Sequence, residues 1–147
     1  MLKETCRTAA PEETEAVGAA LARRMTAEDL PRFVALYGDL GAGKTAFVRG
    51  FAKVVAPGAV IRSPTFALVH EHKGDPFDLF HFDMYRITGP DDLCSIGFDD
   101  YLKRNGVCLI EWSENVAFAL PEHYLRVEIV KDDPGNPDSR RITVTQI

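Results

Sequence analysis

The sequence predicts one α/β layered domain spanning residues 1–147. Its 147 residues are a length that fits a single compact domain. Apolar residues make up 46% and charged residues 27%, a balance typical of globular chains and not of disordered ones. Strand-like runs alternate with helix-like segments, as expected for a sheet layered with helices.

The first third of the chain predicts two strands and two helices. A strand is expected at 2–7, and a helix from Pro11, because proline is tolerated in a first helical turn and acidic residues follow it. The apolar run 33–37 predicts a strand that leads into a glycine-rich turn. An apolar stripe predicts a helix at 45–55, which ends before a Pro-Gly pair.

The rest of the chain predicts strands and short helices separated by turn residues. Strands are expected at 66–70, 77–85, 107–110, 124–131 and 141–146, and short helices from Pro90 and over 98–104. The segment 132–138 is rich in Asp, Pro and Gly and is expected to join the last two strands as a hairpin.

The cysteines and the hydropathy pattern indicate a cytoplasmic protein. Cys6, Cys94 and Cys108 form no Cys-x-x-Cys pair, which argues against a zinc site or a disulfide framework and favours reduced thiols. Cys6 and Cys108 lie in apolar runs and are expected in the core. The sequence has no transmembrane-length apolar run, so no membrane contact is expected.

The segment 38–45, Gly-Asp-Leu-Gly-Ala-Gly-Lys-Thr, matches the P-loop pattern G-x-x-x-x-G-K-[ST]. It follows an apolar strand and opens an apolar helix, the context that the pattern requires; a plain glycine turn is the alternative. Its backbone N–H groups and the helix start favour phosphate, Lys44 would reach the β- and γ-phosphates, and Thr45 would ligate Mg²⁺. The nucleotide-contact candidates are therefore Gly38, Leu40, Gly41, Ala42, Gly43, Lys44 and Thr45. A guanine-reading Asn-Lys-x-Asp is absent from the sequence, which favours ATP.

Two carboxylates could complete such a site. Glu111 ends an apolar run, as in the second nucleotide motif, although aspartate is commoner there and a solvated acid is the alternative. Asp83 lies in His-Phe-Asp-Met-Tyr-Arg at 81–86, where strand alternation puts His81, Asp83 and Tyr85 on one face. Asp83 is expected to position or deprotonate an attacking water, or to hold a magnesium-bound water. His81 is more ambiguous, because a lone histidine is more often a packed or hydrogen-bonding residue than a catalytic one.

Two further segments carry candidate residues. Ser-Pro-Thr at 63–65 lies in the span where P-loop enzymes often carry a switch, so the Thr65 hydroxyl is a candidate sensor of the γ-phosphate; an ordinary turn is the alternative. Trp112, the only tryptophan, follows Glu111 and is either a core residue or an aromatic group for stacking or docking.

Four motifs, in this order and spacing, closely resemble the bacterial TsaE family, formerly YjeE, of tRNA threonylcarbamoyladenosine biosynthesis ATPases. They lie at 38–45, 63–66, 81–86 and 109–112. The resemblance covers residues 11–112, and the tail matches only in general pattern. It implies a single P-loop NTPase-like domain with a mixed central sheet flanked by helices.

The resemblance also implies a function. Family members are ATPases required for the threonylcarbamoyl modification of the adenosine beside the anticodon. They act on the TsaB–TsaD complex, which holds the tRNA, so contact with tRNA would be indirect. ATP hydrolysis would reset that complex between turnovers.

Site residues follow from the same resemblance. Magnesium ligands would fall on Thr45 and Glu111, and Asp83 would handle the water. Trp112 would lie beside the nucleotide or at the partner surface. Family adenine contacts come from the N-terminal segment and the tail, where Thr14 and Arg141 are the candidates.

The expected reaction is transfer of the γ-phosphoryl group of ATP to water. Because no arginine stands in an obvious finger position, hydrolysis is expected to be slow alone and faster in the complex. A small-molecule kinase is an alternative, although an arginine-rich lid is absent from the sequence. A nucleotide switch that docks without hydrolysing is another.

The charge of the chain generates a first prediction. A net charge of −5 without a basic stripe is unlike proteins that grip nucleic acid alone. In a filter-binding assay at physiological salt, the isolated chain should therefore retain little tRNA. Tight retention would show that the chain itself holds RNA.

Overall fold

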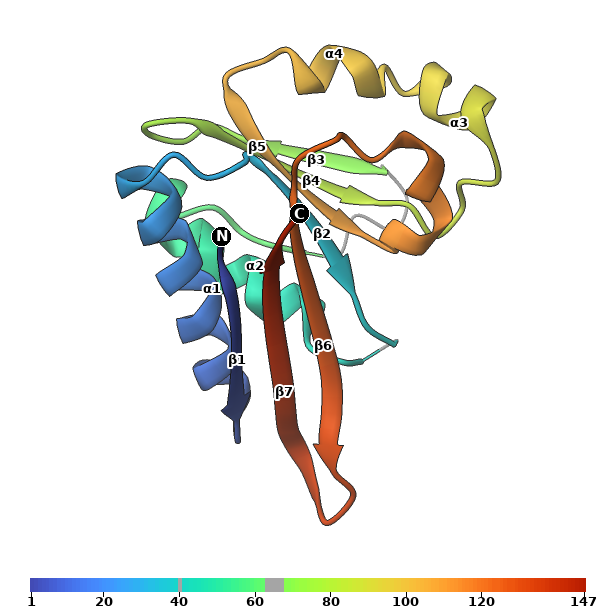
Figure 1. Cartoon of the computed structure of the whole chain (residues 1–147). Helices are drawn as coiled ribbons and strands as arrows, with labels where there is room; N and C mark the ends of the chain where they lie inside the picture. The colour runs from blue at the N-terminus through green and yellow to red at the C-terminus, as the bar shows by residue number, and fades with distance from the viewer. Residues whose placement is uncertain (40, 63–67) are drawn as a thin grey trace.

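The computed structural model describes residues 1–39, 41–62 and 68–147. The elements are β1 (Lys3–Thr8), α1 (Pro11–Ala27), β2 (Phe33–Tyr37), α2 (Lys44–Val55), β3 (Val69–His72), β4 (Asp78–Asp83), α3 (Pro90–Ser95), α4 (Phe98–Leu102), β5 (Gly106–Glu111), the 3₁₀ helix η1 (Ser113–Ala119), β6 (Leu125–Asp133) and β7 (Asn136–Gln146). Within the described ranges the strands form one sheet in the order β1-β7-β6-β2-β5-β4-β3 (Figure 1).

The sheet is mixed. Strand β2 runs parallel to both β5 and β6, and β4 runs parallel to β5. The outer strands are antiparallel to their neighbours: β1 to β7, β7 to β6, and β3 to β4. This arrangement confirms the predicted fold class, a mixed central sheet flanked by helices.

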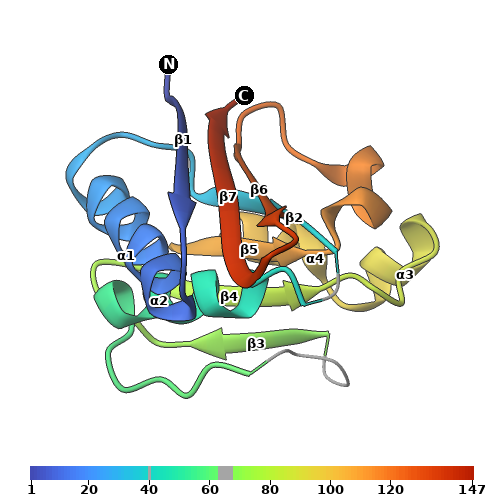
Figure 2. The ribbon, with the colours of Figure 1, turned by 90° about the horizontal axis from the view of Figure 1, so that it is seen from below.

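Helices cover both faces of the sheet, α1 and α2 on one side and α3, α4 and η1 on the other (Figure 2). Side chains alternate between the two cores along each central strand, so that Val34 and Leu36 of β2 face α1 and α2 while Phe33 and Ala35 face the opposite layer. Central parallel strands buried on both faces read as continuous apolar runs, which explains why 33–37 and 107–110 predicted strands correctly.

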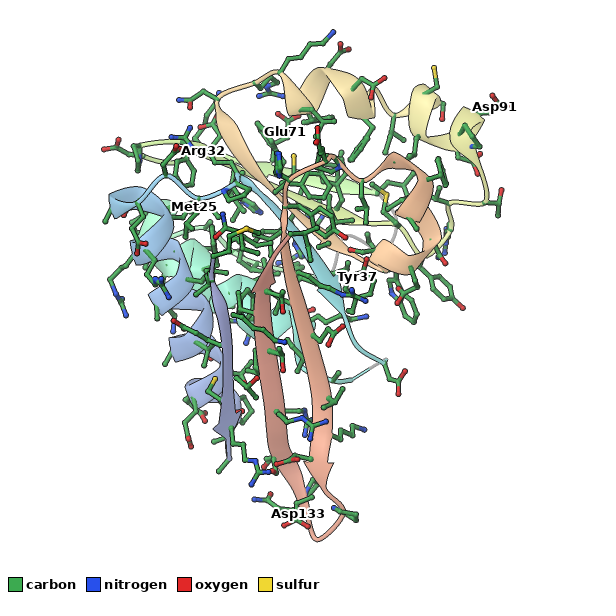
Figure 3. The ribbon with its side chains drawn as sticks, viewed as in Figure 1. Met25, Arg32, Tyr37, Glu71, Asp91 and Asp133 are labelled. Carbon is green, nitrogen blue, oxygen red and sulfur yellow. The ribbon has the colours of Figure 1, made fainter. Side chains whose placement is uncertain are left out.

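The direction of the parallel strands places three loops together. Arg32 precedes β2 and Tyr37 ends it, which marks the direction of this strand (Figure 3). Since β2, β5 and β4 run the same way, the loops that follow them meet at one edge of the sheet, where ligands of α/β proteins usually bind. Among the described helices, none combines the length and the apolar character needed to cross a membrane.

Two local expectations, for Cys6 and Tyr85, were wrong. Cys6 is exposed on the outer strand β1, whereas Cys108 is buried, and burial raises the pKa of its thiol to about 12. Tyr85 lies outside β4 and is exposed, because the chain turns after Asp83, whose Oδ1 accepts the Tyr85 N–H at 2.9 Å.

The last hairpin is longer than expected. Its β7 strand begins at Asn136, whereas the expected strand began at residue 141, and Asn136 pairs with Asp133 inside the segment expected to be the connection. Pro137 is compatible with this strand because it lies beyond the part of β7 that pairs with β1, where Thr8 opposes Arg140.

Two glycines let α1 and α2 pack with their backbones close together. A Cβ atom added at Gly18 would lie 2.1 Å from the carbonyl oxygen of Phe47, and one added at Gly50 would lie 1.8 Å from that of Glu15. Both distances are far inside van der Waals contact. Helix α1 is therefore pressed onto α2, the helix that the glycine-rich loop opens.

We expect Gly50→Ala to destabilise the fold. Helix propensity alone would make this substitution stabilising by about 1 kcal/mol. The new methyl group, however, meets a backbone carbonyl that cannot rotate away, and overpacking of this kind typically costs about 1–3 kcal/mol. Urea unfolding measures the free energy of unfolding of both chains. A variant more stable than the parent chain would contradict the expectation, because it would show that α1 and α2 can move apart to make room for the methyl group.

Candidate functional site

The glycine-rich loop connects β2 to α2 in a backbone shape that depends on glycine. Gly41 and Gly43 have φ angles of 78° and 110°, in the left-handed region that other residues rarely adopt. Gly43 is the N-cap of α2, and among the described residues no side chain caps this helix start. The first N–H groups of α2 are thus presented at the loop, an arrangement that favours anions.

Lys44 is buried within the site although it carries a charge. Its side chain is 5% exposed, and Nζ donates a hydrogen bond to the carbonyl oxygen of Gly38 at 2.7 Å. Nζ also lies 4.1 Å from the centre of the Trp112 ring, within range of a cation–π interaction. The lysine therefore connects the loop after β2 with the end of β5.

Trp112 is neither a core residue nor a free surface group. It is half-buried in a left-handed backbone conformation with φ of 60°, which costs a non-glycine residue about 1–2 kcal/mol. Its ring lies 5.0 Å from the ring of Tyr85, which is 60% exposed. Backbone strain of this kind concentrates at functional sites, and here it occurs at the aromatic residue that lies beside Lys44.

Asp83 and Glu111 lie side by side. They are register partners at the ends of the parallel strands β4 and β5, and each side chain is only 4% exposed. The structure therefore brings together the two carboxylates that the sequence nominated from segments 28 residues apart. His81 lies on the same face of β4 as Asp83, and its Nε2 forms a short hydrogen bond with Oε2 of Glu111.

The oxygen donors suit magnesium. Thr45, at the start of α2, offers a hydroxyl group, and Glu111 and Asp83 offer carboxylates, all hard ligands. In the described part of the chain, no three His, Cys, Asp or Glu side chains are grouped closely enough to hold a metal by themselves. Mg²⁺ fits this pattern, because it usually keeps several waters and shares its shell with substrate phosphates instead of entering an all-protein cage.

Arg140 is a site residue that the sequence did not nominate. Its Nε donates to the carbonyl oxygen of Ala42 at 2.6 Å, and its Nη2 donates to that of Gly41 at 3.2 Å. Since the two groups of a trans peptide point in opposite directions, a carbonyl of Ala42 turned towards Arg140 leaves the N–H of Gly43 pointing away from it. Arg140 thus orients the loop from the β6–β7 hairpin.

The two residues nominated for the adenine end lie in different places. Thr14 of α1 is buried, bonds the Thr8 hydroxyl at 3.0 Å, and has its methyl group 3.8 Å from where a Cβ of Gly43 would lie. Arg141 instead lies 3.9 Å from the carboxylate of Asp132, away from Ala42. Neighbouring strand residues point to opposite faces, so the side chains of Arg140 and Arg141 diverge. The local sequence has no signal that shows which of the two arginines contacts the loop.

Two nominated residues lie outside the described part of the chain, Leu40 of the glycine-rich loop and Thr65 of the expected switch. Their roles stay predictions. A hollow of about 900 Å³ lies at the opposite end of the parallel strands, near Arg32, Tyr101 and Glu122. It contains none of the loop amides or paired carboxylates described above, so we assign the chemistry to the loop and not to the hollow.

The fold and the loop define a protein of the P-loop NTPase-like class. The sheet order, the glycine-rich loop between β2 and α2, and the acidic residues that end β4 and β5 are all features of that class.

Within this class the chain belongs to the TsaE family. The family model described as "Threonylcarbamoyl adenosine biosynthesis protein TsaE" matches residues 8–142. This match confirms the resemblance drawn from the four motifs and extends it into the tail.

Individual relatives agree. A protein of Bacillus subtilis named tRNA threonylcarbamoyladenosine biosynthesis protein TsaE is 36% identical over 141 residues, covering 96% of this chain and 84% of its own. A protein of the same name from Haemophilus influenzae is 42% identical over 104 residues, covering 70% of this chain and 66% of its own. The crystal structure of Bacillus subtilis YdiB superposes with a TM-score of 0.77 at 33% identity, covering 97% of this chain and 84% of that one.

The contact from Arg140 to the loop generates a paired prediction. Arg140→Ala should weaken ADP binding about tenfold or more, because a hydrogen bond from a charged group contributes about 1.5–3 kcal/mol and here supports the loop. Arg141→Ala, which removes the same charge from the neighbouring position, should leave the affinity nearly unchanged. Isothermal calorimetry measures both. Equal losses of ADP affinity in the two variants would mean that the positive charge of the arginines determines the affinity, and not the orientation of the loop by Arg140.

Proposed function

We propose that this chain is a magnesium-dependent ATPase subunit of tRNA threonylcarbamoyladenosine biosynthesis. The observation that best supports this proposal is the glycine-rich loop at the start of α2, together with the register-paired carboxylates Asp83 and Glu111. The names of the relatives supply the pathway. The loop and the carboxylates supply the reaction class.

The loop would bind the triphosphate tail of ATP. Within the described part of the chain no side chain caps the N–H groups at the start of α2, and the dipole of this helix adds positive potential at the same point. Lys44 lies beside the loop, already bonded to the Gly38 carbonyl, and would reach the β- and γ-phosphates with little rearrangement. Arg140 would hold the loop in this shape from outside.

The magnesium ligands would be Thr45 and Glu111. Magnesium held by these two residues would supply positive charge that offsets the negative charge of the phosphates. This chain's own contribution is to fix a hydroxyl at the start of α2 and a carboxylate at the end of β5. Both residues belong to regular secondary structure, so their backbone positions are set before the nucleotide arrives.

Asp83 would handle the attacking water. The water oxygen forms a bond to the γ-phosphorus while the bond from that phosphorus to the β–γ bridging oxygen breaks, giving ADP and phosphate. Asp83 would orient the water and accept its proton. The Tyr85 N–H donates to Oδ1 of Asp83 at 2.9 Å and so restrains the carboxylate.

The partner would be the TsaB–TsaD complex, with tRNA held by that complex and not by this chain. Half-buried Trp112 lies beside Lys44, and the exposed Tyr85 packs on Trp112, so a partner docked on this aromatic pair could sense the state of the nucleotide. Thr65 would act as the switch that reports the γ-phosphate. A cytoplasmic location follows from this role.

Hydrolysis should depend on the partner and on Asp83. We expect slow ATP turnover by the isolated chain and at least about tenfold faster turnover with TsaB–TsaD, since partner-supplied contacts in such enzymes add roughly 10³–10⁵ in rate. Asp83→Asn, which keeps the size and the acceptor for Tyr85, should lower the stimulated rate by about 10²-fold or more. Thin-layer analysis of γ-labelled ATP measures the products.

Each other outcome points to a different function. Label transferred to a small acceptor would indicate a kinase, and an unchanged rate on adding TsaB–TsaD would refute partner activation. Binding without turnover would indicate a non-hydrolysing switch. Asp29→Asn is the matched control, because Asp29 is exposed at the opposite end of the parallel strands, beside the hollow near Arg32, and its loss should not alter the rate.

A further inference from the structure

His81 is a buried polar residue that has no role in the proposed ATP hydrolysis. It lies in the middle of β4 and is completely inaccessible to solvent. Its Nε2 bonds Oε2 of Glu111 on the neighbouring strand. Its Nδ1 is buried without a hydrogen-bond partner among the described residues.

An apolar residue would suit this position better if packing were all that mattered. The neighbours Leu79, Phe80 and Phe82 are all fully buried, and Leu79 and Leu109, on the same face of the sheet, belong to the core beneath α1 and α2. Burying an imidazole there costs free energy, and leaving one nitrogen without a partner adds to that cost. The bond to Glu111 is what offsets it.

The bond also decides how Glu111 presents its carboxylate. The last torsion of a glutamate side chain is broad, so the two oxygens of a free glutamate have no preferred direction. A donor fixed in a central strand removes that freedom, because it holds Oε2 on the β4 side. The remaining oxygen, Oε1, is then the one that can be offered to a ligand.

The direction of the hydrogen bond follows from the same contact. A carboxylate oxygen can only accept, so the N–H at Nε2 of His81 donates the hydrogen bond to Oε2 of Glu111. Outer partners of this kind commonly set the direction and the affinity of metal ligands.

We propose that His81 is a positioning residue for magnesium, which holds one oxygen of Glu111 so that the other is directed towards the metal beside Thr45. This proposal rests on the proposed function, because it requires a metal–nucleotide site at the loop. It assigns His81 no contact with nucleotide, water or metal.

The test compares magnesium coupling in three chains. For each chain, the ADP dissociation constant is measured by calorimetry in excess Mg²⁺ and in EDTA, and the Mg²⁺ concentration that gives half of the difference is determined. His81→Leu should raise that concentration about 10- to 100-fold while leaving ADP binding in EDTA unchanged. His81→Gln should restore most of the coupling, because the glutamine amide nitrogen can reach the position of Nε2.

Two controls separate positioning from folding. His70→Leu alters the cross-strand partner of His81 on β3, two strands from Glu111, and should leave magnesium coupling unchanged. If His81→Leu fails to fold, His81→Asn replaces it, because the asparagine amide ends short of Glu111 while remaining polar. Thermal unfolding of every variant shows which chains can be compared.

The possible results distinguish a failure of the role proposed for His81 from a failure of the proposed function. Equal magnesium coupling in the parent chain and His81→Leu would overturn the proposal, as would a loss in His81→Gln as large as that in His81→Leu. Failure of the parent chain to bind ADP at all would instead overturn the proposed function. A parent chain that binds ADP with strong magnesium coupling, lost in Leu or Asn and kept in Gln, supports both.

Discussion

The parallel pairing of β2, β5 and β4 is the constraint on which the site depends. Because these strands run in one direction and in register, Asp83 and Glu111 end side by side, next to the loop that leaves β2. A one-residue slip of β4 against β5 would turn one carboxylate to the opposite face of the sheet. Apolar side chains on both faces of the sheet hold this register. The two hydrophobic cores therefore stabilise the polar site at the carboxyl ends of the parallel strands.

Two other parts of the fold, α1 and the β6–β7 hairpin, support the loop and the helix that follows it. Helix α1 presses on α2 at Gly18 and Gly50, and the β6–β7 hairpin supplies Arg140 to the loop carbonyls. Thr14, from the same α1, lies against Gly43. Preorganisation of this kind lowers the entropy lost when a phosphate binds, since the N–H groups need not be gathered first.

Much of this architecture could be predicted from local patterns. The 33–37 strand, the helix start at Pro11 and the loop at 38–45 follow from apolar runs, proline placement and glycine spacing, which are properties of a few adjacent residues. The alternation in 81–86 correctly separated Asp83 from Phe80 and Phe82. It failed for Tyr85, because Asp83 bonds the backbone two residues on and ends the strand.

The sequence by itself determined the class of the fold, the loop and the two carboxylates, because each depends on side chains close together in the chain. Tertiary structure alone decided that Arg140 and not Arg141 supports the loop, that Cys6 is exposed, and that His81 is buried against Glu111. These facts depend on strand order and on register between distant segments; the His81–Glu111 bond spans 30 positions and the Arg140–Gly41 bond spans 99. Contacts over such separations arise from the packing of whole elements, which no short pattern records.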